Sequence, residues 1–319
     1  MNAVRLIALL LILITYQPVI ADSGRLTADI RPILQSVHFK IDPSGPDYSG
    51  STLITLQAGS EISEFSLHAD GIEISGLRLG DGGEPVAVEY SIENDLLTVT
   101  SARPLAPGRY GLAIDFSNEF NTQAVGLYRM ESEGVGYAYT QFEASDARKA
   151  FPSFDEPEFK IPFQFTVTAK ESDEVVTNTP VRSETRHEGW KTLEFGLTRP
   201  LPTYLLAMAV GPMESVPIPE LPVPGRIYTP RGMSGLTGYA GAMVAPILDW
   251  QQSYFGMAYP YEKLDFIAIP EYWPGAMEHP GAITFSDQII LLDENSVSAN
   301  QRRIAALVIA HELAHQWFG

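Results

Sequence analysis

Two histidines and a glutamate near the end of the sequence have the types and spacing of a metal site that activates water. The residues HELAH at 311–315 place His311 and His315 four positions apart. In a helix such a pair projects from one face, so both rings can bind one tetrahedral Zn²⁺. Glu312 would lie beside the metal, where its carboxylate can take a proton from the bound water. The alternative is a partly buried helix whose two histidines have ordinary hydrogen-bond partners.

The segment that carries these residues has the pattern of a helix with a defined start. Ser298 and Gln301 fit a capping box, in which each side chain satisfies a free backbone N–H of the first turn. The run 302–318 contains neither Gly nor Pro, which favours a helix. We expect the two histidines to share its apolar stripe, which would consist of Ile304, Leu307, Val308, Ala314 and Phe318.

Five longer blocks of sequence point to a known family. HELAHQWFG at 311–319 and PGAMEHPGAITF at 274–285 resemble the zinc helix and the exopeptidase loop of the gluzincin aminopeptidases, the group that includes aminopeptidase N and leukotriene hydrolase. YTQFEASDARKAFPSFDEP at 139–157 resembles the block of the family's first domain that reaches the active site. GLYR at 126–129 and FGMAYPYEKLD at 255–265 are further matches. The resemblance covers nearly all of the chain after its first residues.

The resemblance implies a zinc aminopeptidase with one Zn²⁺ per catalytic domain, acting on peptides that have a free N-terminus. His311 and His315 would be zinc ligands, and Glu312 would be the general base. Glu278 would bind the α-amino group, because fixed carboxylates hold an ammonium and reject a chain that continues through the site. The other implied substrate contacts are Gly275, Ala276 and Met277 along the peptide backbone, and Gln141 and Glu143 in the amine pocket.

Two features differ from the family pattern. His279 stands where the family usually has Asn, and a histidine there could still contact the substrate as a hydrogen-bond donor. The family's third zinc ligand, a glutamate on a following helix, and its oxyanion-stabilising tyrosine would lie beyond Gly319. We therefore expect this 319-residue chain, as the front portion of an intact enzyme, to bind zinc weakly and to be inactive by itself.

Other interpretations of these residues stay open on the sequence. Gln141 and Glu143 alternate along an expected strand and could face solvent, and Glu278 could be an ordinary loop acid. A non-catalytic peptide-binding member of the same fold is the alternative function, but the intact HELAH motif favours the enzyme. Nothing in the sequence independently supports a second activity as an epoxide hydrolase.

Alternating apolar and polar residues predict short strands over the first two thirds of the chain. Phe163, Phe165 and Val167 alternate with polar residues, and 97–100 and 110–116 repeat the pattern. We predict an all-β antiparallel domain, a sandwich or saddle-shaped sheet, over 25–224, with its boundary at the proline-rich run 217–225. The first part of an α+β thermolysin-like catalytic domain would occupy 225–319. Its expected elements are a helix over 239–254, a buried strand over 264–269 and a strand pair over 283–292.

The first residues have the pattern of an export signal. Arg5 precedes the apolar run 6–14, and 19–21 offer residues suited to cleavage near Ala21. Residues 1–21 would then be a signal peptide. A retained anchor is the alternative, which the shortness of the run disfavours. The mature protein would be periplasmic or extracellular, without stable membrane insertion.

Composition narrows the function further. The chain has 39 acidic and 21 basic residues and a net charge of −18, which repels phosphate backbones and argues against nucleic-acid partners. It has no cysteine, so disulfides cannot stabilise it. With 45% hydrophobic and 19% charged residues it can bury real cores. The preferred N-terminal residue of the substrate and the oligomeric state cannot be inferred from the sequence.

Overall fold

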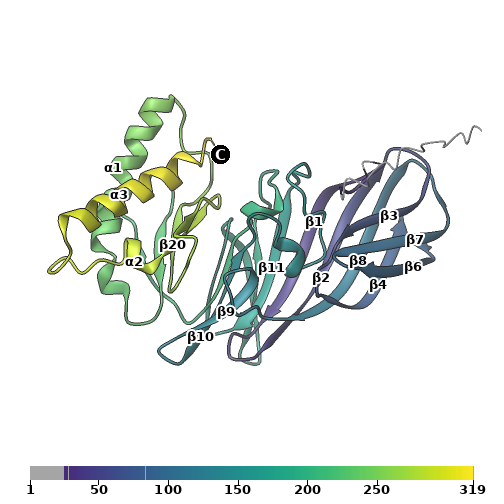
Figure 1. The fold of residues 1–319 in the computed structure, drawn as a ribbon, viewed down its shortest axis with the longest axis horizontal. Helices are drawn as coiled ribbons and strands as arrows, with labels where there is room; N and C mark the ends of the chain where they lie inside the picture. The colour runs from purple at the N-terminus through teal and green to yellow at the C-terminus, as the bar shows by residue number, and fades with distance from the viewer. Residues whose placement is uncertain (1–24, 28, 83, 319) are drawn as a thin grey trace, which may run out of the picture.

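The chain forms two lobes of different composition (Figure 1). The computed structural model describes residues 25–318 apart from residues 28 and 83, so the expected signal peptide at 1–21 lies outside the described residues. Three β-sheets build the first lobe, and helices pack with a fourth sheet in the second. The predicted order of an all-β domain and an α+β domain is thereby confirmed. Within the described residues, no helix combines the length and apolar content needed to cross a bilayer.

An eight-stranded sheet is the framework of the first lobe. Its neighbouring strands are antiparallel except for β1 and β11, which run parallel. Phe163, Phe165 and Val167 of β11 are buried while the residues between them are half-buried, so the predicted alternation is confirmed. In spatial order the strands are β13 (Val181–His187), β14 (Trp190–Phe195), β11 (Phe163–Lys170), β1 (Ile30–Ile41), β2 (Asp47–Ala58), β8 (Gly108–Glu119), β4 (Glu73–Asp81) and β5 (Glu84–Val86).

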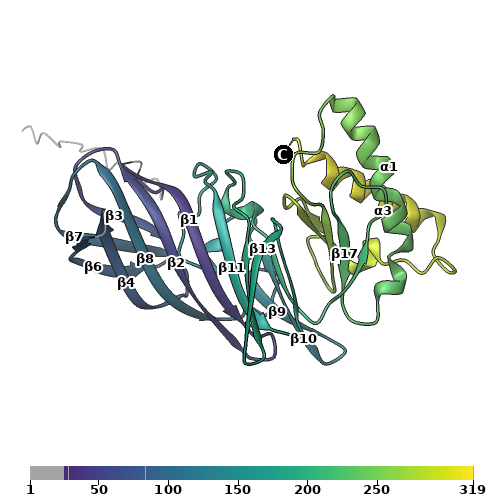
Figure 2. The ribbon, with the colours of Figure 1, turned by 180° about the vertical axis from the view of Figure 1, so that it is seen from behind.

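Two smaller sheets complete the first lobe. A three-stranded sheet packs beside β4 and β8 at the far end of the lobe (Figure 2), and the side chains of Leu67 and Val99 share one core with the large sheet. A four-stranded sheet lies toward the second lobe (Figure 1). The strands of the smaller sheets are β3 (Ile62–His68), β7 (Leu96–Leu105) and β6 (Val88–Glu93), then β12 (Glu174–Thr177), β15 (Met208–Gly211), β10 (Val135–Gln141) and β9 (Gly126–Ser132).

A mixed five-stranded sheet and the helices form the second lobe. The helices α1 (Gly238–Phe255) and α3 (Ala299–Ala314) lie together and bury apolar side chains against the sheet, and α2 (Asp287–Ile290) is a single turn (Figure 1). Every residue of β18 is buried, as predicted for 264–269. The strands are β16 (Glu214–Pro217), β17 (Arg226–Thr229), β18 (Asp265–Ile269), β20 (Ala282–Ser286) and β19 (Ala276–Met277).

A separate core joins the two lobes. It contains tyrosines from β9 and β10 of the first lobe, and Ile267, Tyr272 and Met277 from the second. Because side chains of both lobes pack in this one core, the first lobe helps to position the loops of the second lobe.

Two sequence predictions for the second lobe need correction. β16 pairs with β17, so the second sheet begins at Glu214 rather than at residue 225. The proline-rich run 217–225 is the connection between these two strands, closed by a hydrogen bond from the Ile218 N–H to the Gly225 carbonyl. The strand pair predicted over 283–292 is one strand, β20, followed by the helical turn α2, which buries Ile290.

The end of α3 and its buried face also differ from the prediction. The helix ends at Ala314, and residues 315–317 form a turn. Its buried residues are Ala305, Ile309, Glu312 and Leu313. Leu307, which was assigned to the apolar stripe, is 66% exposed. The histidines therefore do not lie on the face that packs into the core.

Candidate active site

The zinc-helix candidate α3 begins where the sequence places it. The Ser298 hydroxyl accepts the Gln301 N–H at 3.2 Å, and the Gln301 side chain accepts the Ser298 N–H at 3.0 Å, which confirms the capping box. Gln251 of α1 donates to the Ala310 carbonyl at 2.6 Å and holds the two helices together beside the histidines. The last turn is therefore fixed from the neighbouring helix as well as from its own start.

The two histidines face one another at the end of α3. Their Nε2 atoms are 3.1 Å apart, with ring planes at 84°. The Nδ1 of His315 lies 2.9 Å from the Phe318 carbonyl, to which it can donate. That hydrogen bond selects the tautomer whose Nε2 carries a free lone pair.

This geometry fits a metal ion with nitrogen ligands. A tetrahedral Zn²⁺ with ligands at about 2.0–2.1 Å holds two nitrogens roughly 3.3 Å apart, close to the observed separation. A backbone carbonyl on the second ring nitrogen is also usual for zinc-binding histidines. In the described part of the chain, however, no group of three or more His, Cys, Asp or Glu side chains is placed to hold a metal. His311 and His315 would supply two ligands of a larger set.

Glu312 is a buried carboxylate beside these rings. Its side chain is turned away from solvent, and its Oε2 atom has no hydrogen-bond partner among the described residues. Burial raises the pKa of Glu312 to about 8, and the negative charges of Glu278 and Glu143 add to the effect. A cation held by the two histidines would lower the pKa of Glu312 again, because a nearby positive charge favours the ionised carboxylate.

β19 and the turn before it place Glu278, the residue that follows this strand, next to the histidines. Gly275 has φ of +87°, a conformation that side chains with a Cβ avoid, and its N–H donates to the Tyr272 carbonyl at 3.1 Å. Gln316, at the end of the HELAHQ run, donates to the Glu278 carbonyl at 3.0 Å. The Glu278 carboxylate lies 3.9 Å from Nδ1 of His315. The exopeptidase-loop and zinc-helix motifs are thus bound to each other directly.

Most of the predicted site residues line one cleft of about 560 Å³. It receives Glu143 from the first lobe, Glu278 from the loop, and both histidines and Glu312 from α3. Its remaining lining residues are Pro274, Gly275, Ala276, Met277, Ile289, Leu307 and Val308. Three carboxylates and two imidazoles therefore converge beside an apolar wall.

Two predicted site residues are placed elsewhere. Gln141, at the end of β10, is 2% exposed, and its amide oxygen accepts a hydrogen bond from the Tyr272 hydroxyl. His279 is fully buried, does not line the cleft, and has no hydrogen-bond partner on either ring nitrogen among the described residues. The structure gives no support to a substrate contact by His279, because its ring is buried away from the cleft.

Sequence reasoning missed some neighbours of the cleft. Tyr272 and Tyr204 lie near the acidic groups of the cleft. Burial is the main cause of the raised pKa of both phenols, and the charges of Glu143 and Glu278 raise it further. Leu307, predicted on the apolar stripe that the histidines share, lines the cleft beside them. Tyrosines within apolar runs resemble ordinary core residues, so only the spatial arrangement identifies these two.

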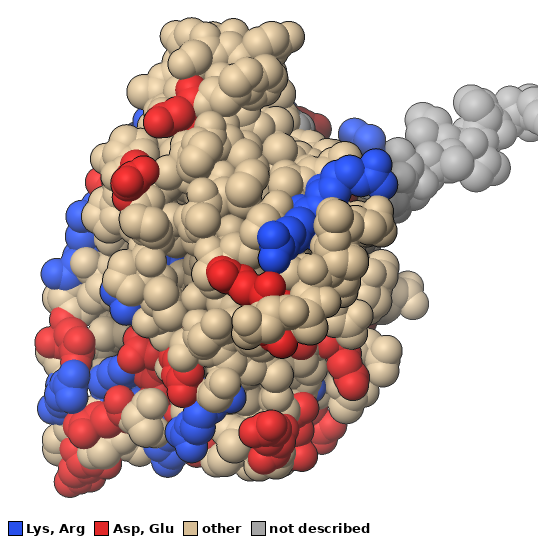
Figure 3. All heavy atoms as spheres, turned by 90° about the vertical axis from the view of Figure 1, so that its left-hand side faces the viewer, with Lys and Arg blue, Asp and Glu red and all other residues tan. Residues whose placement is uncertain are grey.

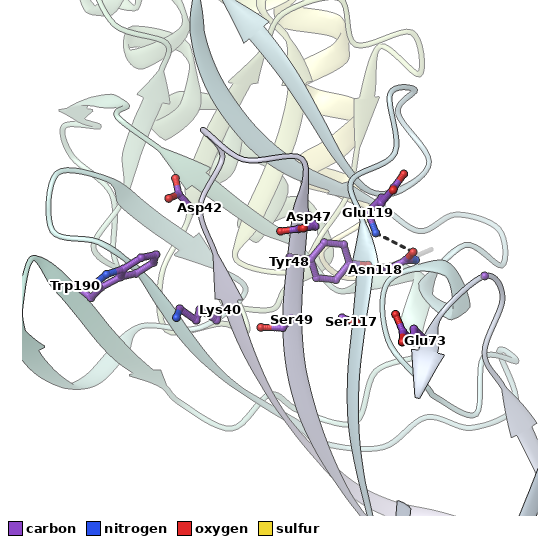
Figure 4. Close-up of a pocket in the computed structure, with 11 residues that line it drawn as sticks. Lys40, Asp42, Asp47, Tyr48, Ser49, Glu73, Ser117, Asn118, Glu119 and Trp190 are labelled. Atoms are coloured by element: carbon purple, nitrogen blue, oxygen red, sulfur yellow. Dashed lines mark hydrogen bonds between the residues drawn. The ribbon is translucent and has the colours of Figure 1, made fainter. Parts of the chain in front are cut away.

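A larger hollow of about 750 Å³ lies in the first lobe, at the ends of β1, β2 and β8 (Figure 4). Both acidic and basic side chains line it, and some of them form ion pairs with neighbouring residues. Lys170 pairs with Asp42 at 3.2 Å and stacks on the Trp190 ring at 3.9 Å. No histidine lines it. Despite its size, it lacks the convergent groups found in the cleft on α3.

Comparison with known proteins agrees with the geometry. Residues 31–205 match the Peptidase M1 N-terminal domain, and residues 239–319 match the Peptidase family M1 domain. The chain belongs to peptidase family M1. In this family M1 chain the two matched regions contribute Glu143 on one side of the cleft, and Glu278 and the HELAH helix on the other.

Similar proteins are named aminopeptidases. The chain is 33% identical over 303 residues to aminopeptidase M1-B of Oryza sativa subsp. japonica, covering 93% of this chain and 34% of that protein. It is 33% identical over 311 residues to glutamyl aminopeptidase of Bos taurus, covering 92% and 32%. With aminopeptidase N of Acetobacter pasteurianus it shares 30% over 304 residues, covering 93% and 85%. The chain spans about one third of the rice and cattle relatives.

Proposed function

We propose that this family M1 chain carries the metal-binding helix and the amine pocket of a zinc aminopeptidase that removes N-terminal residues from peptides. One observation carries the proposal: Glu143 and Glu278 reach the cleft from different lobes and meet the HELAH residues there. An acidic pocket next to a metal-binding pair suits a substrate that presents an ammonium group beside the bond to be cleaved.

The histidines and Glu312 would perform the hydrolytic chemistry. His311 and His315 would hold Zn²⁺ through their Nε2 atoms, with further ligands from outside the described residues. Bound zinc is a Lewis acid that lets water ionise near neutral pH. The Oε2 of Glu312, which has no hydrogen-bond partner in the described part of the chain, would accept the proton of the attacking water and pass it to the departing amine.

Glu143 and Glu278 would restrict cleavage to the end of a peptide. Both carboxylates sit at the cleft and can pair with one α-ammonium group. A substrate that continues past this point, or whose amine is blocked, would leave these acids without a cationic partner and so bind poorly. Peptides with a free N-terminus are therefore the proposed substrates.

The decisive test compares free and N-acetylated peptides on the full-length protein. Free peptides should be cleaved at their first bond, and acetylated peptides should be very poor substrates. Glu278→Gln should narrow this gap, mainly by slowing cleavage of the free peptides. Equal cleavage of both kinds by the unmodified protein would show an endopeptidase, and binding of peptides without hydrolysis would show a non-catalytic member of the family.

We also propose that the protein is exported. The support is the sequence of residues 1–21, in which a basic residue is followed by an apolar run and a cleavage-type ending. Fractionation of cells and N-terminal sequencing of the mature protein test this. A mature chain that begins at residue 22 in the periplasm or medium agrees with the proposal, whereas a retained Met1 in the cytoplasm contradicts it.

A further inference from the structure

The loop that carries Glu278 is tied to the first lobe at both ends. Before Glu278, the Tyr272 hydroxyl donates to the amide oxygen of Gln141 and accepts from the Thr284 hydroxyl at 3.2 Å. After Glu278, the Asn178 amide donates to the Pro280 carbonyl at 3.0 Å, and also to a carbonyl of its own lobe at 2.9 Å. The loop cannot shift relative to the first lobe without breaking these contacts.

The Tyr272 hydroxyl differs from those of Tyr128 and Tyr139 in its cluster, whereas Tyr137 also makes a hydrogen bond across the lobes by accepting the Arg231 N–H at 3.1 Å. Tyr272 packs among Tyr128, Tyr137 and Tyr139 in the core between the lobes. The hydroxyls of Tyr128 and Tyr139 are buried and have no hydrogen-bond partner among the described residues. That of Tyr272 is equally buried but makes two hydrogen bonds, one of them across the lobes. Buried hydrogen bonds fix geometry, because breaking one leaves a polar atom unsatisfied.

The contact joins the two segments that supply the amine-pocket carboxylates. Gln141 is two residues before Glu143, and the residue between them, Phe142, is buried. Tyr272 leads into the turn that presents Glu278, since its carbonyl accepts the Gly275 N–H. Glu143 and Glu278 are acidic groups at one cleft, so their mutual repulsion favours separation unless a contact constrains their segments. The Tyr272–Gln141 hydrogen bond is placed to supply that constraint.

We propose that Tyr272 is a positioning residue for the substrate's amino group: by holding Gln141 it sets the spacing of Glu143 and Glu278. This inference rests on the proposed aminopeptidase function and adds a residue to it. Gln141 then acts from behind the pocket, as an anchor for the strand that presents Glu143. The consequence is specific. Loss of the hydroxyl should weaken recognition of a free amine, while the groups on α3 that act on water keep their own contacts.

The test is Tyr272→Phe in the full-length, zinc-loaded protein. We expect KM for leucyl and alanyl anilides to rise about 10-fold, the equivalent of one buried hydrogen bond, with kcat within about 3-fold. Inhibition by isoamylamine, a simple amine probe without a cleavable bond, should weaken by a similar factor. Tyr128→Phe and Tyr139→Phe remove hydroxyls from the same cluster without breaking a hydrogen bond and should leave KM and inhibition unchanged.

A double-mutant cycle separates positioning from general damage. Gln141→Met alone should resemble Tyr272→Phe, and adding Tyr272→Phe to it should cause little further change, since both remove one contact. Independent, additive effects would overturn the inference, as would a Tyr272→Phe protein with unchanged KM or with a loss confined to kcat. If the unmodified protein cleaves acetylated and free peptides alike, the proposed function fails and this inference fails with it.

Discussion

Replacement of His279 should remove a specific source of acid sensitivity from the fold. The ring is completely buried, and burial lowers the pKa of His279 from 6.5 to about 4. In the unfolded chain the histidine titrates near its ordinary value. Between pH 6.5 and 4, His279 is therefore protonated in the unfolded state but largely neutral in the folded state.

The sign and size of the effect follow from this difference. Stability must fall as the pH drops, because the unfolded state binds more protons in this window. With the two pKa values above, His279 costs the folded state about 2 kcal/mol at pH 5 and about 3 kcal/mol at pH 4, relative to pH 7.5. Above pH 7.5 the contribution is close to zero. Replacement by a residue without a titrating group should abolish this term.

The assay is urea unfolding of wild type and His279→Leu at pH 7.5, 6, 5 and 4. The difference between the two proteins at each pH cancels the titration of all other groups. At pH 7.5 the variant should be about as stable as wild type, because leucine has a similar volume and lacks the two unpaired nitrogens. It should gain about 2 kcal/mol over wild type by pH 5.

His279→Asn distinguishes charge from packing. Asparagine is polar and smaller, so it should lower stability at every pH. Like the leucine variant, however, the asparagine variant should lack the loss of stability at acid pH that His279 causes. Parallel pH curves for wild type and both variants would refute the reasoning. The protonated ring would then be accommodated in the folded state, which requires partners that the structure does not show.

Three further predictions follow from the same structure. Glu312→Gln in the full-length protein should keep its zinc by elemental analysis and lose about 10² to 10⁴ in kcat, and turnover like wild type would remove Glu312 as the base. Asp265→Asn should cost roughly 3–5 kcal/mol of unfolding free energy, because the buried Lys263 ammonium, 2.6 Å from that carboxylate, would keep only the Gly281 carbonyl. Phe151→Ala should cost about 3–5 kcal/mol, and a loss below 1 kcal/mol in urea unfolding would contradict its place in the core.

The close approach of His311 and His315 could be predicted from the sequence because its geometry is local. Four positions along one helix bring His311 and His315 together whatever the rest of the fold does, and the capping box at Ser298 fixes where that helix begins. The burial of β11 in alternate positions is local in the same sense. When residues repeat with the period of a helix or strand, a few neighbouring residues are enough to predict which side chains share a face.

The direction of the α3 faces could not be predicted in this way. Leu307 is apolar like Ile309, yet it lines the cleft whereas Ile309 lies in the core. Periodicity identifies an apolar side chain but does not reveal whether it contacts a core or a cleft wall. The buried carboxylate of Glu312 made the pattern harder to interpret, since a charged residue normally marks the exposed face.

Gln141 and His279 show a second limit. Both lie within blocks that match the family, and both are buried, one bound to Tyr272 and the other behind Glu278. A motif shows which residues accompany a site but not which of them face it. The parallel pairing of β1 with β11 was equally out of reach, because it joins segments more than a hundred residues apart.

The block 139–157 shows how a loop of the first lobe reaches the cleft on α3. Glu143 leaves the core at Phe142, and the chain returns to it at Phe151, whose ring packs 6.0 Å from that of Phe142. Between them Arg148 donates to Asp155 through its backbone N–H at 3.2 Å and its side-chain Nε at 3.0 Å. The Asp155 carboxylate therefore closes the loop. No local pattern in the sequence predicts where Glu143 points, whereas the folded loop places it in the cleft with the two histidines.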